Sequence, residues 1–375
     1  TGLFECVRDL PGAALLDSSR PHSSRGRYDI ITADPVAPAP PGLDPSAGEA
    51  DCRRYFAELE RFRSEQFGEA GPLPSDIPFG GGLLGFIGYD CGRGLNRVAV
   101  GGGSAPDSTA GGSHLMAYDW CLVQDHTLSR TVLVAQPGVS ERRRLDLLAR
   151  FRGAANHSQG TFRLLQRFKA NLSAEEYGAA FQRIADYILA GDCYQVNLAQ
   201  RFSAACEGDP WVAYRALRPV AAAPFAGFLA RDDGGAVLSL SPERFLALQG
   251  RHVETMPIKG TRPRHADPLA DQRAARELQA SPKDRAENVM IVDLLRNDLG
   301  RSCVPGSICV DRLFELQSFA TVHHLVSVVS GELRPERGPL ELLRDSFPGG
   351  SITGAPKRRA MEIIAELEPD PRRVY

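Results

Sequence analysis

The stretch from Phe225 to Ile258 constrains the fold most, because it alternates short apolar segments with turn signals. Asp232-Asp233-Gly234-Gly235 marks one turn and Gly250-Arg251 marks another. This spacing is typical of consecutive antiparallel strands joined by tight turns. The sequence therefore predicts a meander of three strands here. A turn at Gly250-Arg251 would pair Gln249 with His252.

Helices are predicted on both sides of this meander. Ser173 is an expected N-cap, with Glu176 completing a capping box before an apolar stripe at helical spacing. Ser281 opens a second helix that we expect to run to about Leu299. Tyr194–Gln200 instead alternates apolar and polar residues, which predicts a strand. Together these patterns indicate an α+β fold, with large antiparallel β-sheets packed with helices.

Composition and charge exclude several classes of protein. The 375 residues carry a formal net charge of -2, which gives no electrostatic reason to expect a nucleic-acid or anionic-membrane partner. No uninterrupted apolar run is long enough to span a bilayer, and no signal segment opens the chain. The sequence begins at Thr1 rather than Met, which indicates a processed or cut N-terminus. The eight cysteines form no C-x-x-C pair, so we expect free thiols and a cytoplasmic location.

Lys259 lies in the stretch Met256–Pro263, between an apolar run and Gly260, and the stretch has a proline on each side of the lysine. We expect the preceding residues, His252–Ile258, to form a strand that ends beside the lysine. A lysine at such a strand end can lose water and part of its affinity for a proton, which makes it a nucleophilic amine. The alternative is a lysine whose ammonium lies in solvent, as most lysines do.

Glu243 is the nearest candidate proton donor to Lys259 in the predicted meander. Regular pairing would put Glu243 opposite Ile258 and would point the glutamate and the lysine to opposite faces of the sheet. Pro242 and Pro257 argue against regular pairing, because proline favours edges and bulges. We therefore expect a break near Pro257 that lets both side chains open on one pocket.

Three further features can carry chemistry. Asp284 and Glu287 lie three residues apart on one predicted helix, which suits Mg²⁺, although an acid in the first turn can simply cap the helix. The loop Gly349–Lys357 precedes a helix and can present backbone N–H groups to an anion, or it can be an ordinary turn. His324 lies on a predicted strand, where a core histidine is the more common case.

Four motifs, in this order and spacing, resemble the chorismate-utilising enzymes over nearly the whole chain: Leu240–Phe245, Pro257–Thr261, Asp284–Arg301 and Phe347–Glu368. Within that family the chain most resembles the component I enzymes of aminodeoxychorismate synthesis. Anthranilate synthases resemble it but carry alanine at the position of Lys259. Isochorismate and salicylate synthases carry a water-activating lysine where this chain has Gln195.

The resemblance implies a reaction and its residues. Mg²⁺ would be held by Glu287, with help from Asp284. Lys259 would attack C2 of chorismate while the C4 hydroxyl leaves, with Glu243 as general acid or base and His324 as a third catalytic residue. Ammonia from a separate glutamine amidotransferase subunit would then add at C4, giving 4-amino-4-deoxychorismate for p-aminobenzoate and folate synthesis. The implied substrate-binding residues are Gly260, Thr261, Ser351, Ile352, Thr353, Gly354, Ala355 and Lys357.

The resemblance also divides the chain into residues 1–155, which carry tryptophan-pocket motifs, and residues 160–375, a chorismate-binding catalytic domain. The implied tryptophan-binding residues are Leu16, Ser18, Arg25, Gly26, Arg27, Tyr28, Pro224, Phe225 and Ala226. The segment Ser24–Tyr28 departs from the usual pattern, so tryptophan occupancy stays open.

The resemblance further predicts a C-terminal truncation. In the family, a strand follows the position of Tyr375, and that missing segment carries the second Mg²⁺ carboxylate and an arginine for a substrate carboxylate. Two alternatives therefore stay open: an anthranilate synthase component I, and a catalytically incomplete fragment that only binds its partner or tryptophan. Lys259 argues against the first alternative, and the missing segment argues for the second.

Overall fold

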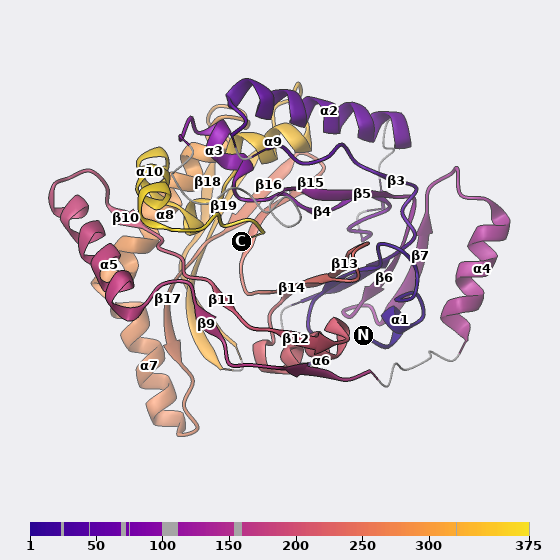
Figure 1. Cartoon of the computed structure of the whole chain (residues 1–375), viewed down its shortest axis with the longest axis horizontal. Helices are drawn as coiled ribbons and strands as arrows, with labels where there is room; N and C mark the ends of the chain where they lie inside the picture. The colour runs from indigo at the N-terminus through magenta and orange to yellow at the C-terminus, as the bar shows by residue number, and fades with distance from the viewer. Residues whose placement is uncertain are drawn as a thin grey trace.

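The computed structural model describes residues 1–23, 26–44, 46–68, 73–74, 76–99, 112–153, 160–319 and 321–374. These residues form a mixed fold of helices and antiparallel sheets (Figure 1). The described helices are α1 (Gly2–Glu5), α2 (Glu49–Phe67), α3 (Cys91–Leu95), α4 (Glu141–Arg152), α5 (Ala174–Leu189), α6 (Pro210–Ala221), α7 (Pro268–Ala280), α8 (Pro282–Gly300), α9 (Pro339–Ser346) and α10 (Lys357–Leu367), with one 3₁₀ turn, η1 (Gly350–Ile352).

The first large sheet has six antiparallel strands in the order β14-β13-β1-β2-β6-β7. Their bounds are β1 (Ala14–Asp17), β2 (Tyr28–Thr32), β6 (Trp120–Asp125), β7 (Arg130–Ala135), β13 (Phe225–Ala230) and β14 (Ala236–Ser241). An aromatic core packs against it: the ring of Trp211 on α6 lies 4.8 Å from Phe4, 5.2 Å from Phe228 and 5.4 Å from Tyr214. Full burial of each such side chain contributes about 1.5–3 kcal/mol, so this core fixes α6 on the sheet.

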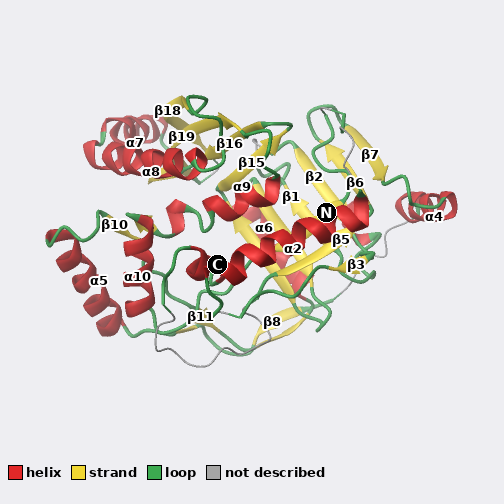
Figure 2. Ribbon diagram, turned by 90° about the horizontal axis from the view of Figure 1, so that it is seen from above, coloured by secondary structure: helices red, strands yellow, loops and turns green. Residues whose placement is uncertain are grey.

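The second large sheet has five strands and is built on one long strand, β19 (Val322–Glu332). On one side β19 pairs with both β16 (His252–Met256) and β17 (Ile258–Pro263), which follow each other along it. On the other side it pairs with β18 (Cys309–Ser318), and β15 (Arg244–Gln249) lies beyond β16. Helices α7 and α8 lie side by side over this sheet (Figure 2).

Smaller sheets complete the described part of the chain. One has the order β3-β5-β4, and three others have two strands each, β8-β12, β9-β11 and β10-β20. Their bounds are β3 (Ala37–Pro38), β4 (Gly82–Phe86), β5 (His114–Tyr118), β8 (Phe162–Leu164), β9 (Lys169–Ala170), β10 (Gln195–Val196), β11 (Phe202–Ser203), β12 (Cys206–Gly208) and β20 (Gly354–Ala355).

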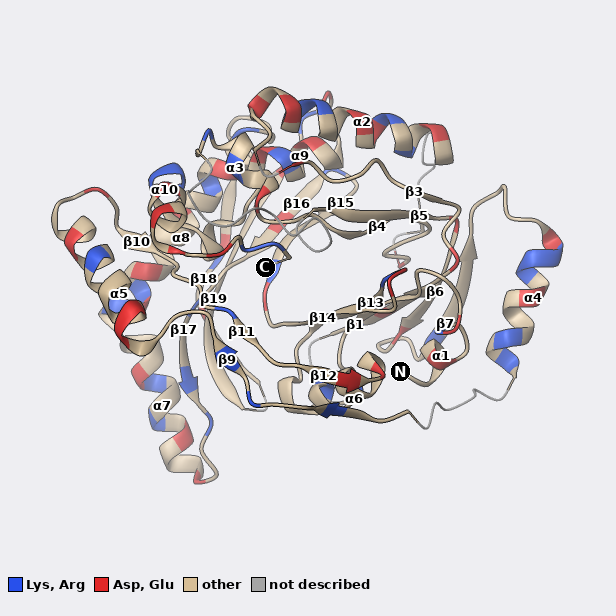
Figure 3. Ribbon diagram, viewed as in Figure 1, with Lys and Arg blue, Asp and Glu red and all other residues tan. Residues whose placement is uncertain are grey.

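Charged residues gather on helices at the outside of the molecule, notably α2, α4 and α7, while the strands of the two large sheets are mostly uncharged (Figure 3). Such a distribution is ordinary for a globular protein. No helix among the described residues is long and apolar enough to cross a membrane.

The predicted α+β class and two helix starts are confirmed. Ser173 caps α5 in a capping box with Glu176, and the Ser281 side chain accepts the backbone N–H of Asp284 at the start of α8. The turn at Gly250-Arg251 also pairs Gln249 with His252 as expected.

The predicted three-strand meander is wrong in its layout. The segment forms four strands, of which β13 and β14 belong to the first large sheet and β15 and β16 to the second. The predicted strand Tyr194–Gln200 is also shorter, because only β10 pairs in a sheet; after it the N–H of Ala199 bonds to the Glu368 carboxylate. The domain division at residues 155 and 160 stays a prediction, and β13 and β14 share a sheet with β1, β2, β6 and β7.

Candidate active site

Lys259 lies in β17 because the sheet is interrupted at Pro257. Proline has no N–H to continue a ladder, and β16 ends at Met256 while β17 begins at Ile258. The carbonyl of Pro257 still accepts the N–H of Ser327 at 3.2 Å. The lysine is therefore the second residue of a new strand, which corrects the expectation that it follows a strand end. Its Nζ lies 3.4 Å from the backbone carbonyl oxygen of Ser351 and donates to it.

Glu243 reaches the same place from the junction of β14 and β15. The pairing of β15 with β16 shifts register between Arg244 and Ala247, as a bulge does. Burial raises the pKa of the Glu243 carboxyl, while the Ser351 side chain, the charge of Lys259 and the Ile258 backbone N–H act in the opposite direction. The expected break in regular pairing is thus present, and it brings the glutamate and the lysine within electrostatic reach of each other.

Gly260 lets β17 approach α8 closely. Its φ is +91°, a conformation that side-chain-bearing residues rarely adopt, and an added Cβ would lie 2.9 Å from Leu278 Cδ1 and 3.0 Å from Asp284 Cβ. Next to it, Thr261 Oγ1 and His324 Nδ1 are hydrogen-bonded at 2.9 Å. Burial lowers the pKa of His324, although a hydrogen bond to the Gly260 backbone acts in the opposite direction. The imidazole is therefore neutral at pH 7.

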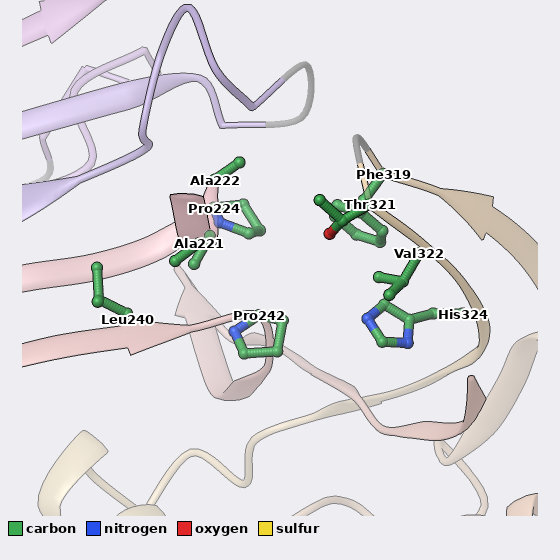
Figure 4. Close-up of a pocket in the computed structure, with 10 residues that line it drawn as sticks. Ala221, Ala222, Pro224, Leu240, Pro242, Phe319, Thr321, Val322 and His324 are labelled. Carbon is green, nitrogen blue, oxygen red and sulfur yellow. The ribbon is translucent and has the colours of Figure 1, made fainter. Parts of the chain in front are cut away.

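A pocket of about 290 Å³ opens beside His324 (Figure 4). In Figure 4, His324 and Val322 face Pro224 and Pro242 across it. Its lining residues are Ala221, Ala222, Ala223, Pro224, Leu240, Pro242, Phe319, Thr321, Val322 and His324. Pro242 of this lining directly precedes Glu243, and His324 is hydrogen-bonded to Thr261, two residues after Lys259. Its lining contains no charged side chain apart from what His324 can carry, so it suits a neutral group better than a carboxylate.

Two carboxylates come from the first two turns of α8, and Asp284 packs against Gly260. Asp284 is buried, and one of its oxygens accepts from Arg262 Nη2 at 2.9 Å. Glu287 is half-buried, with Lys283 Nζ at 3.9 Å. Within the part of the chain that the structure describes, no three His, Cys, Asp or Glu side chains gather into a metal cluster. The two carboxylates nevertheless fit Mg²⁺, which commonly takes one or two protein carboxylates plus substrate oxygens. Of the two, Glu287 has the longer ion-pair contact, at 3.9 Å against 2.9 Å for Asp284.

The loop before α10 uses its carbonyl groups to accept hydrogen bonds. The Ser351 carbonyl accepts from Asn197 Nδ2 at 3.3 Å as well as from Lys259. The hydroxyl of Thr353 donates to the carbonyls of Gly349 and Gly350, at 3.1 and 3.2 Å. The predicted anion site at the N–H groups of this loop stays a prediction.

The end of this loop has packing roles. An added Cβ at Gly354 would lie 2.1 Å from the Gln195 carbonyl oxygen, and Ala355 pairs with Gln195. Ile352 packs in an apolar cluster with Met361. Buried Lys357 donates to Asp298 Oδ2 at 2.6 Å and to the Ser346 carbonyl at 2.9 Å. This ion pair ties α10 to α8, and the predicted substrate contact of Lys357 stays a prediction.

The structure brings the predicted tryptophan-binding residues to the edges of β1, except Arg25, which lies outside the described residues. Leu16 pairs with both β2 and β13, so Tyr28, Phe225 and Ala226 come close to it in the sheet. Ser18 donates to Asp29 Oδ1 at 2.6 Å, and Gly26 packs so closely that an added Cβ would lie 2.1 Å from Ser18 Cβ.

The remaining residues of this set continue the same region. Arg27 forms an ion pair with Asp125 at 2.8 Å, and Pro224 lines the pocket of Figure 4. Beside them Arg218 makes two hydrogen bonds to buried Asp17, at 2.6 and 2.9 Å. Tryptophan binding stays a prediction.

Sequence reasoning missed three neighbours of the site. Asn197 holds the Ser351 carbonyl, Arg262 holds Asp284, and the side chain of Arg372 donates to the Ile352 carbonyl at 2.5 Å. Of these three contacts, only that of Asn197 had a local signal in the sequence, because the alternation of Gln195 and Asn197 placed the asparagine on a polar face. The other two contacts depend on tertiary packing.

A model of the chorismate binding enzyme family matches residues 15–375, and the chain belongs to that family. Among individual proteins, it is 43% identical to aminodeoxychorismate synthase component 1 of Salmonella typhimurium, over 99% of this chain and 81% of that protein. It is 36% identical to anthranilate synthase component 1 of Streptomyces coelicolor, over 96% of this chain and 71% of that protein. The crystal structure of anthranilate synthase component I from Streptococcus pneumoniae TIGR4 matches with a TM-score of 0.75 and 28% identity, covering 94% of this chain and 80% of that one.

Proposed function

We propose that the protein is an aminodeoxychorismate synthase component 1, which converts chorismate and ammonia to 4-amino-4-deoxychorismate. The observation that carries this proposal is the position of Lys259, an amine held at 3.4 Å from the Ser351 carbonyl and within electrostatic reach of Glu243. The similarity to a protein of that name over 99% of the chain supports it. Anthranilate synthase relatives also match. The family resemblance distinguishes the two activities by this position, where anthranilate synthases carry alanine in place of Lys259.

In the proposed reaction, the neutral amine of Lys259 forms a bond to C2 of chorismate. The ring double bonds shift, and the C4 hydroxyl leaves as water with a proton from Glu243. Burial raises the pKa of that carboxyl, so a larger fraction of it carries the proton that a general acid needs. Ammonia then forms a bond to C4 and loses a proton, the double bonds shift back, and the lysine amine leaves C2.

The other predicted residues would bind and orient the substrate. Gly260, Thr261 and the segment from Ser351 to Ala355 would line the ring. His324 would face the ring from the uncharged pocket, which would admit neutral ammonia. Glu287, with help from Asp284, would hold Mg²⁺, which supplies positive charge for a substrate carboxylate.

Two partners belong to this proposal. The name component 1 of the relatives supports a second component, and we propose that it is a glutamine amidotransferase that supplies ammonia. Tryptophan at the predicted residues around β1 would be a bound ligand of the same protein. Calorimetry with tryptophan tests it, and a Phe225→Ala variant should bind more weakly because Phe225 lies in that set.

Product analysis tests the proposed function. The native protein is incubated with chorismate, ammonium and Mg²⁺, and the products are separated by chromatography and identified by mass. We expect 4-amino-4-deoxychorismate, with no product from Lys259→Ala. Anthranilate as the product would support the alternative synthase. Chorismate left unchanged, by a protein that still binds the amidotransferase, would support a role in binding alone.

A further inference from the structure

We propose that Thr261 is a positioning residue for His324: its hydroxyl accepts the Nδ1–H of the imidazole, so that the Nε2 lone pair faces the pocket of Figure 4. There the lone pair would take the proton that ammonia loses when it adds at C4. The inference rests on the proposed function for the identity of that proton. The hydrogen bond and the direction of the ring can be tested whatever product the protein makes.

A register shift in the second large sheet brings Thr261 to His324. β17 pairs antiparallel with β19, and this pairing shifts by one residue between Ile258 and Thr261. Without the shift His324 would lie opposite Gly260, which has no side chain, whereas with it Thr261 is the direct partner. Directly opposed residues have their side chains on the same face of a sheet. Accordingly, Thr261 Oγ1 lies 2.9 Å from His324 Nδ1.

The other side of the imidazole faces the pocket. The ring of Phe319 packs edge-on against that of His324, with centroids 5.3 Å apart, and the histidine is buried. In Figure 4 one ring nitrogen of His324 points across the pocket toward Pro242. Because Nδ1 is the nitrogen bonded to Thr261, the nitrogen that faces the pocket is Nε2.

The lining of this pocket favours a lone pair at Nε2. A neutral imidazole carries one N–H, and a threonine hydroxyl can accept it or can donate to the bare nitrogen. Apart from His324 itself, the only polar side chain in the lining is that of Thr321, and buried N–H groups are left without an acceptor more rarely than acceptors are left without a donor. The proton is therefore better placed on Nδ1, where Thr261 accepts it. A hydrogen bond to the Gly260 backbone, also on β17, acts in the same sense.

This arrangement makes His324 a base in the second half of the proposed reaction. When the nitrogen of ammonia bonds to C4, one of its N–H bonds breaks and the proton passes to Nε2. The imidazolium still donates its Nδ1–H to Thr261, so the positioning bond persists in both protonation states. The lysine nitrogen takes up one proton as it leaves C2 and the imidazolium gives up one, so the ring is neutral again at the end of the cycle.

The neighbouring histidine shows how an imidazole with a purely structural role is held. His323 is buried, with Nδ1 at 2.8 Å from Ser318 Oγ and Nε2 at 3.0 Å from Asp271 Oδ1. Both of its nitrogens thus bond to side chains of the protein, whereas Nε2 of His324 faces a pocket. A threonine that only stabilised β17 could be replaced without changing the tautomer of His324. The tautomer is therefore the readout that separates the two roles.

The experiment compares Thr261→Val, which keeps the shape of the side chain without its hydroxyl, with Thr261→Ser, which keeps the hydroxyl. Ser318→Ala is the matched control, because it removes the same kind of bond from His323. In ¹⁵N-histidine-labelled protein without chorismate, NMR distinguishes the ring nitrogen that carries the proton, and His324→Gln assigns the signals. We expect the proton on Nδ1 in the native protein, in Thr261→Ser and in Ser318→Ala, and a shift of the proton toward Nε2 in Thr261→Val.

Turnover with chorismate, ammonium and Mg²⁺ supplies the second readout. Loss of the hydrogen bond should lower kcat about tenfold in Thr261→Val, and kcat should recover in Thr261→Ser and stay unchanged in Ser318→Ala. KM for chorismate should change little, because the hydroxyl would hold the imidazole and not the substrate. A raised KM with unchanged kcat would show that the hydroxyl binds substrate, and this would overturn the inference.

The tautomer itself gives the decisive outcomes. A native His324 with its proton on Nε2, or ¹⁵N signals that do not change when the hydroxyl is removed, overturns the inference. If Thr261→Val does not fold, Thr261→Ala replaces it. The expected change of tautomer in a protein that makes no 4-amino-4-deoxychorismate leaves the positioning intact and refutes the proposed function instead.

Discussion

Replacing Gly260 with alanine should damage both stability and the site, because two separate costs fall on one residue. The φ of +91° costs a residue with a side chain about 1–3 kcal/mol. The new Cβ would also lie 2.9 Å from Leu278 Cδ1 and 3.0 Å from Asp284 Cβ, and such overpacking costs about 1–3 kcal/mol. We therefore expect Gly260→Ala to lower the free energy of unfolding by about 2–6 kcal/mol.

Gly250→Ala is the matched control, because Gly250 also has a positive φ, +60°, but nothing lies within 4 Å of its added Cβ. Gly250→Ala should lower the free energy of unfolding only by the cost of the positive φ, about 1–2 kcal/mol. Urea unfolding with an unchanged m-value measures both losses. Gly260→Ala should also lower turnover, because relief of the clash moves Asp284 and α8 away from β17. Equal losses of stability in the two variants would refute the claim that close packing of β17 on α8 requires the glycine.

Two further predictions concern charged groups. Glu287→Gln should raise the Mg²⁺ concentration needed for half-maximal turnover at least tenfold without a matching loss of stability. Asp293→Asn, at an exposed position of the same helix, is the control. Equal Mg²⁺ dependence of the two variants would rule out Glu287 as the Mg²⁺ ligand. Burial alone would raise the pKa of Asp17, but hydrogen bonds to Arg218, Ser19 and Tyr214 outweigh burial and lower this pKa. The stabilising effect of the Asp17 carboxylate should therefore be complete above about pH 4 and disappear as pH falls through the folded-state pKa. Asp17→Asn should accordingly lower the free energy of unfolding by about 3–5 kcal/mol at pH 7 and by much less in acid; urea unfolding across pH measures this, and a loss independent of pH would contradict it.

Features that depend on near neighbours in sequence could be predicted from the sequence. The capping box of Ser173 and the turn at Gly250-Arg251 need only a few consecutive residues, and both are present. The proline at 257 likewise predicted a break in the ladder. What it could not predict is that the chain resumes along the same neighbour, β19, so that Lys259 lies near the start of a strand.

Features that depend on distant partners could not be predicted in this way. The segment from Phe225 to Ile258 divides between two sheets because β13 pairs with β1 and β16 pairs with β19, and neither partner is local. The ion pair of Lys357 is another such feature, because its partner Asp298 lies on a different helix and the pair is buried. The contact of Lys259 with Ser351 joins positions 92 residues apart, so the family motifs indicated both residues without indicating that they touch.

The most direct test of the account is the mass of the protein after reaction with chorismate. The native protein is incubated with chorismate and Mg²⁺ without ammonia, quenched in acid, and examined by intact-protein and peptide mass spectrometry. Because the bond from the lysine amine to C2 would expel the C4 hydroxyl as water, we predict an adduct equal to chorismate less one water, mapped to Lys259 and discharged when ammonia is added. Lys259→Ala should show no adduct. An adduct of undiminished yield in that variant, or one mapped to another residue, would contradict the assignment of Lys259 as the nucleophile.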